Sequence, residues 1–181
     1  MSEGKYSEFI PGKSHLKQLY VRIILFVFGR AFQAGYKSDR DIKAEFDSLP
    51  SDFLFDLCVM PSGPHMLVGR DKSGRIKYMG SRLKPGLKPS LAMKVKNIQS
   101  AFTMFTFSES TTIASARNRL VVEGELKYAM SMVRVMNLLE VYLLPKPVAK
   151  MGVKRYPVWS QLSPLRKYTG RIRLYLRLIT G

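Results

Sequence analysis

Two acidic residues flank a single glycine in the stretch RNRLVVEGELKYAM, residues 117–130. Paired carboxylates can act as a general acid and a general base, but that chemistry needs convergent, partly buried groups. Glu123 ends an apolar run and Glu125 opens a methionine-rich one, so Gly124 fits a joint between a strand and a helix. A residue without a Cβ permits a sharp change of direction there, and a carboxylate in the first helical turn is favoured by the helix dipole. We therefore interpret the two acids as structural.

Other residues with catalytic or metal-binding side chains are few. His15 and His65 lie fifty residues apart, without a cluster of Cys or acidic residues at metal-ligand spacing. Cys58 is the single cysteine, so no internal disulfide can form, and its alternation with apolar residues is typical of a packed thiol. No Gly-x-Ser-x-Gly elbow occurs. We expect a protein that is not an enzyme and that has no metal site and no cofactor.

The charge of the chain is unevenly distributed. Residues 1–60 are neutral, whereas residues 61–181 hold 22 Lys or Arg and five Asp or Glu, which accounts for the whole net charge of +17. Such a surface favours anionic partners, either an anionic membrane or a nucleic acid. A basic protein without such a ligand is the alternative. For nucleic acid the support is charge alone, because no recognised motif or aromatic stacking platform accompanies it.

No stretch contains the roughly 20 consecutive apolar residues that a membrane-spanning helix needs. The closest, YVRIILFVFGRAF at 20–32, carries Arg22 and Arg30. The first nine residues contain two glutamates, which is atypical of a secretory signal. We expect a cytoplasmic protein that touches a membrane surface.

The hydrophobic pattern predicts the elements that position these residues. Residues 15–36 have the periodicity of an apolar helix, and 39–48 that of a short helix capped by Ser38. Strands are predicted over 53–60, 65–70, 75–80, 91–96 and 119–123, with a tight turn at Asp71-Lys72-Ser73-Gly74. Helices are predicted over 97–117 and 125–144. Together they indicate an α/β (α+β) domain with about five mainly antiparallel strands covered by helices.

Methionines and phenylalanines cluster in the later half of the chain. The segment FTMFTF lies at 102–107, and the 125–144 helix carries three methionines among its apolar residues. At helical spacing such residues form an ordinary core, but they also make a flexible wall that admits an apolar guest. Both interpretations stay open. The candidate lipid-binding residues are Met93, Val95, Phe102, Phe105, Met130, Val133 and Met136.

The order of elements between about 40 and 144 resembles that of the sterol-carrier-protein type of lipid-transfer domain. The matching segments are DIKAEFDSL, FLFDLCVM, PHMLVGRDKSGRIKYMG, SLAMKVKNIQSAFTMF and RLVVEGELKYAMSMVRVMNLL. The resemblance implies an apolar tunnel for a fatty acyl chain, an isoprenoid or a sterol. Its bacterial branch includes an accessory factor of ubiquinone biosynthesis, which makes an isoprenoid ligand a candidate. We divide the chain into an arm and apolar helix (1–36), a lipid-binding domain (37–144) and a basic extension (145–181).

The basic extension ends in SPLRKYTGRIRLYLRLITG, where apolar and mostly basic residues alternate. This alternation predicts a strand or an extended arm over Ser163–Gly181. Its cations are candidate contacts to anionic lipid headgroups, namely Arg166, Lys167, Arg171, Arg173 and Arg177. The alternative is a tail folded onto its own domain or onto a dimer mate.

The combined prediction is non-enzymatic binding and carriage or presentation of an apolar lipid at an anionic membrane surface. The rivals are a basic nucleic-acid-binding module and an interaction protein whose 15–36 helix docks on a partner or on itself.

Overall fold

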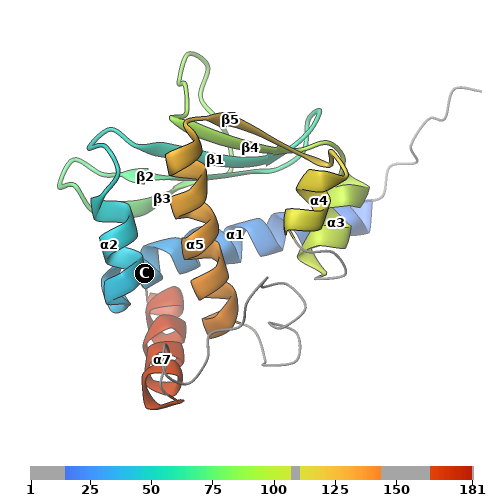
Figure 1. Ribbon diagram of the computed structural model, residues 1–181. Helices are drawn as coiled ribbons and strands as arrows, with labels where there is room; N and C mark the ends of the chain where they lie inside the picture. Colours follow the sequence, from blue (N-terminus) through green and yellow to red (C-terminus); the bar gives the residue numbers. More distant parts are fainter. Residues whose placement is uncertain (1–14, 107–110, 144–163, 181) are drawn as a thin grey trace, which may run out of the picture.

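The computed structural model describes residues 15–106, 111–143 and 164–180, and Figure 1 shows a sheet with helices gathered on one face. The sheet has five strands in the order β3-β2-β1-β4-β5. Every neighbouring pair is antiparallel except β1 with β4. The strands are β1 (Leu54–Val59), β2 (His65–Arg70), β3 (Ile76–Gly80), β4 (Leu91–Val95) and β5 (Leu120–Gly124). The predicted α+β class with a mainly antiparallel sheet is confirmed.

Six helices accompany the sheet in the described part of the chain. They are α1 (His15–Ser38), α2 (Arg40–Asp47), α3 (Ile98–Phe105), α4 (Thr111–Ala116), α5 (Leu126–Leu143) and α7 (Pro164–Thr180). Among these residues no helix has the length and hydrophobicity to cross a membrane.

The two faces of the sheet follow from the alternation along its central strand. Phe55, Leu57 and Val59 of β1 point towards the helices and join the hydrophobic core. Asp56 and Cys58 belong to the opposite face, which no helix covers in Figure 1, yet both are buried. On this face His65 of β2 and Lys94 of β4 flank Cys58 in the strand register.

Helix α1 is part of the core. Val21, Leu25 and Phe32 are almost completely buried, and the Phe32 ring meets the rings of Phe46 on α2 and Phe55 on β1 at 6.0 Å each. Full burial of one such side chain contributes about 1.5–3 kcal/mol to stability. The hydrophobic effect therefore holds α1 against the sheet. The boundaries of the three-part division of the chain stay a prediction.

The joint at Gly124 is structural, as predicted. Gly124 has a φ of 128°, and a Cβ there would lie 2.6 Å from the backbone oxygen of Ser90. Helix α5 begins two residues later, and the Glu125 carbonyl accepts the first helical hydrogen bond, from the Tyr128 N–H at 3.0 Å. The two acids bind lysines instead of each other: Glu123 pairs with Lys94 at 2.7 Å, and Glu125 pairs with a neighbouring lysine at 3.3 Å.

The predicted cap of the second helix is wrong by one residue. Asp39, and not Ser38, is the N-cap of α2: its Oδ1 accepts the N–H groups of Asp41 at 2.9 Å and Ile42 at 3.1 Å. Its Oδ2 accepts a hydrogen bond of 2.6 Å from the hydroxyl of Tyr142 on α5. The two oxygens of the Asp39 carboxylate thus serve both elements at once.

The prediction of a strand or extended arm at Ser163–Gly181 is also wrong, because residues 164–180 form helix α7. Leu174 and Leu178 are four positions apart, so they share one helical face as well as one side of a strand. Leu174 is 1% exposed, Leu178 packs against the core, and Gly170 lies against the Tyr142 ring. These contacts, which local alternation does not reveal, select the helix.

Candidate functional site

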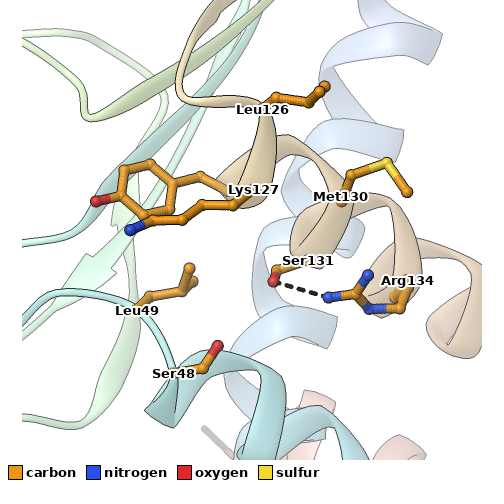
Figure 2. A pocket seen from close by; sticks show the side chains of 8 residues that line it. Ser48, Leu49, Leu126, Lys127, Met130, Ser131 and Arg134 are labelled. Atoms are coloured by element: carbon orange, nitrogen blue, oxygen red, sulfur yellow. Dashed lines mark hydrogen bonds between the residues drawn. The ribbon is translucent and has the colours of Figure 1, made fainter.

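A pocket of about 580 Å³ lies between the end of α2 and the first turns of α5. This volume falls within the range of roughly 300–1,000 Å³ that is typical of small-molecule sites. Figure 2 shows its lining side chains projecting from these two segments. They are Ser48, Leu49, Leu126, Lys127, Tyr128, Met130, Ser131 and Arg134.

The floor of the pocket is buried and its rim is exposed. Leu49, Tyr128 and Ser131 have at most 8% of their surface exposed. The Tyr128 ring is fixed by an edge-on contact of 5.6 Å with the Phe53 ring. At the rim, Leu126 and Met130 are 77% and 51% exposed. Large exposed apolar side chains at the edge of a partly apolar pocket are a feature of surfaces that take an apolar ligand.

Two cations stand at the same rim, and both have acidic partners. Arg134 forms a bidentate pair with Glu45 of α2 at 2.6 and 2.8 Å, and it donates to Ser131 Oγ at 3.2 Å (Figure 2). The hydrogen bonds from Arg134 hold the pKa of Glu45 below its ordinary value. Lys127 lies over the Tyr128 ring at 5.0 Å, and its hydrogen bond to an exposed glutamate raises its pKa. The pocket thus combines an apolar interior with a fixed guanidinium and an exposed ammonium.

The structure brings six of the seven predicted lipid-binding residues into one hydrophobic core. The buried ones are Met93, Val95, Phe105 and Met136. The partly buried ones are Phe102 and Val133. Met130 lies apart from them, on the exposed face of α5, and is the one that lines the pocket. An enclosed tunnel walled by the six stays a prediction.

The predicted membrane-contact residues of α7 have different surroundings. Arg171 donates to the backbone carbonyls of Tyr142 at 2.8 Å and Val141 at 3.3 Å, and Arg177 donates to the carbonyl of Lys37. Arg173 is exposed and lines a second pocket at the start of α2. The side chains of Arg166 and Lys167 lie outside the described residues. A membrane contact by these cations stays a prediction.

Sequence reasoning missed most of this pocket. Met130 is the one lining residue that the sequence analysis had singled out, as part of the methionine-rich helix. Leu49 and Tyr128 carry no local signal, because their positions depend on how α2 and α5 pack.

The structure brings His65 together with side chains that the sequence pattern did not associate with it; the expectation that the protein has no metal site stays a prediction. The Nδ1 of His65 lies 3.0 Å from Oδ1 of Asp56, and the Cys58 thiol is in the same group. The spacing Asp-x-Cys on a strand, followed by a short return to His65, is the signal that could have revealed it.

The chain matches no protein-family model, and no curated protein matches it in sequence. Solved structures do match. The sterol carrier protein domain 2 of Helicoverpa armigera has 13% identity, with 64% of this chain and 87% of that chain covered and a TM-score of 0.45. UbiJ-SCP2, a ubiquinone synthesis protein, has 12% identity, coverage of 69% and 96%, and a TM-score of 0.43. Sterol carrier protein 2 like 2 from Aedes aegypti has 10% identity, coverage of 55% and 93%, and a TM-score of 0.32.

Proposed function

We propose that the chain binds one apolar lipid through the pocket between α2 and α5 and presents it at an anionic membrane surface. The observation that carries the proposal is the pair of exposed apolar side chains, Leu126 and Met130, at the mouth of a 580 Å³ pocket with a buried floor. A fatty acyl chain, an isoprenoid or a sterol would meet that surface. The ammonium of Lys127 at the rim suits an acidic headgroup.

The expected affinity is modest. Each methylene that leaves water contributes about 0.8 kcal/mol, so ten methylenes give roughly 8 kcal/mol before the costs of association. The resulting dissociation constant is micromolar at best. A ligand bound with micromolar affinity can be exchanged, as carriage or presentation of a lipid requires.

The experiment is titration of the full chain with a fluorescent fatty acid. Met130→Glu places a charge at the mouth of the pocket, and we expect the affinity to fall roughly tenfold, about 1.4 kcal/mol, because part of the apolar contact is lost. Met79→Glu is the matched control: Met79 is 50% exposed on β3, against 51% for Met130. Equal loss in both variants, or no loss in either, would contradict this placement of the ligand.

A second variant separates the surface pocket from a cavity inside the core. Met136 is buried beneath the sheet and is absent from the lining of the pocket. If Met136→Trp lowers uptake while its circular dichroism is unchanged and Met130→Glu binds normally, the lipid lies among the core residues instead.

The nucleic-acid alternative rests on the net charge of +17. Mass spectrometry of an organic extract of the purified protein tests the two together. A stoichiometric lipid supports the proposal, whereas co-purifying nucleic acid, seen in the ultraviolet absorbance, supports the alternative.

A further inference from the structure

Three side chains with metal-binding atoms meet on the face of the sheet that is opposite to the helices. Asp56 and Cys58 are two positions apart on β1, so both point to this face. His65 on β2 is directly opposite Cys58 in the antiparallel register. Their ligand atoms all lie within 4.8 Å of one another. In the described residues this is the one such group of three.

The distances are close to those of a coordination sphere. The His65 Nδ1 lies 3.0 and 3.1 Å from the two oxygens of Asp56. Two ligands bound to Zn²⁺ at about 2.1 Å in tetrahedral geometry lie about 3.4 Å apart, so this pair needs little movement. Cross-strand neighbours have Cβ atoms about 4.5–5.5 Å apart, so rotation of the Cys58 and His65 side chains can bring the sulfur to the same centre.

The donor set is selective in its chemistry. An imidazole nitrogen, a thiolate and a carboxylate are the three ligand types of Zn²⁺, whereas Mg²⁺ and Ca²⁺ prefer oxygen alone. Asp56 and Cys58 are 2% and 5% exposed, which keeps competing water away. His65 has 29% of its side chain exposed, so the metal would be reached from its side.

The surrounding charges can accommodate a divalent cation. Lys94 lies beside Cys58 in the parallel register with β4, and it pairs with Glu123 at 2.7 Å. Arg22 and Arg82 line the pocket that contains His65, so the cation would bind within reach of two arginines as well as of the acidic residues. Once deprotonated, the ligands Asp56 and Cys58 carry two negative charges, which a divalent ion neutralises. In the absence of metal, burial raises the pKa of the Cys58 thiol to about 12, so binding must displace a proton from sulfur.

We infer that Asp56, Cys58 and His65 form a binding site for a zinc-class divalent cation, with a fourth position open to water or to another ligand. The site is distinct from the proposed lipid pocket, because the two share no residue. The metal ligands lie on β1 and β2, whereas the lipid pocket lies between the end of α2 and α5. Its failure would leave the lipid proposal untouched.

The test is titration of the full, tag-free chain with Co²⁺ and then with Zn²⁺, in a reductant that does not bind metals. Cobalt bound to a thiolate gives a charge-transfer band in the near ultraviolet. The chain has one cysteine, so the band reports Cys58 alone. We expect one Co²⁺ per chain, a band that saturates, and its loss when Zn²⁺ displaces the cobalt.

Three variants identify the ligands. Cys58→Ser should abolish the band, and Asp56→Asn and His65→Gln should each weaken binding by more than the roughly 10–100-fold that loss of an outer partner causes. The matched control is His15→Ala, the other histidine of the chain, which should bind Co²⁺ as the unchanged protein does. Circular dichroism checks that each variant is folded, and Cys58→Ala replaces Cys58→Ser if the serine is not tolerated.

Two results would overturn the inference. One is the absence of a charge-transfer band from the unchanged protein at saturating Co²⁺. The other is a band that keeps its affinity in both Asp56→Asn and His65→Gln, because the thiol would then bind cobalt without the site.

Discussion

Glu140 lies on α5 with 6% of its surface exposed, and its Oε2 has no hydrogen-bond partner among the described residues. Burial raises the pKa of this carboxyl from 4.5 to about 7. An ionised carboxylate without a partner in such a place costs free energy, so the folded protein holds the proton more tightly than the unfolded chain does.

The direction of the shift decides how stability depends on pH. Below about pH 4.5 Glu140 is protonated in both states and costs nothing; as the pH rises to about 7 its contribution to the free energy of unfolding falls. Glu140→Gln removes this loss. We expect the variant to exceed the unchanged protein by roughly 2–3 kcal/mol at pH 8 and to equal it near pH 4.5, as measured by urea unfolding. The exposed Glu125→Gln is the control, and a pH-independent difference for Glu140→Gln would contradict the prediction.

At the scale of elements, Asp39 connects two helices with one carboxylate. Its Oδ1 caps α2 and its Oδ2 accepts the buried hydroxyl of Tyr142. Asp39→Ala should lower the free energy of unfolding by roughly 2–4 kcal/mol, because a cap contributes about 1 kcal/mol and an unsatisfied buried hydroxyl costs about 1–3 kcal/mol.

The neighbouring Ser38 supplies the control for this prediction. Its hydroxyl oxygen is buried and has no hydrogen-bond partner among the described residues, so Ser38→Ala removes no hydrogen bond and should not lower the free energy of unfolding. Thermal or urea unfolding measures both variants. A loss in Ser38→Ala as large as that in Asp39→Ala would mean that the serine is the cap.

Local patterns were sufficient to predict most of the elements. The five strands and helices α1 to α5 follow from periodicity and turn residues, which are properties of adjacent positions. The strand or extended arm predicted over Ser163–Gly181 was wrong because Leu174 and Leu178 fit the spacing of a strand and of a helix equally well. The contacts of α7 with α1 and α5 decide in favour of the helix. The pocket depends on how α2 and α5 pack, and the group around His65 depends on the register between β1 and β2. Neither the packing nor the register can be read from a single stretch of sequence.

At the scale of the whole molecule, the positive charge and the exposed side of α7 both support the proposed contact with an anionic membrane. Tyr168 and Ile172 are 61% and 60% exposed, and Arg173 is exposed beside them. Apolar and cationic groups on one helix suit the interface of an anionic membrane, where each nearby cation contributes about 1 kcal/mol and salt weakens the attraction. Deletion of α7 would remove the buried Leu174 and uncover the parts of α1 and α5 that α7 contacts, so a point substitution is the cleaner probe.

Ile172→Asp should weaken binding to anionic vesicles roughly tenfold in a sedimentation assay, since it removes apolar contact and adds a repelled charge. Ile113→Asp is the matched control: Ile113 is 47% exposed on α4. Binding of the unchanged protein should also fall as salt is added. Undiminished binding by Ile172→Asp would move the contact elsewhere, and the exposed apolar residues of α1 are then the next candidates, namely Leu16, Leu19, Ile23 and Phe26.

The contact between α1 and α7 has a consequence for synthesis. Arg30 donates to the carbonyl of Leu178, which is 148 positions later in the chain, at 3.2 Å. At about 5–20 residues per second, a ribosome adds the intervening residues in roughly 7–30 s. During that interval the side of α1 that α7 covers has no partner from its own chain. The core therefore stays incompletely covered until α7 has been synthesised and has docked on α1.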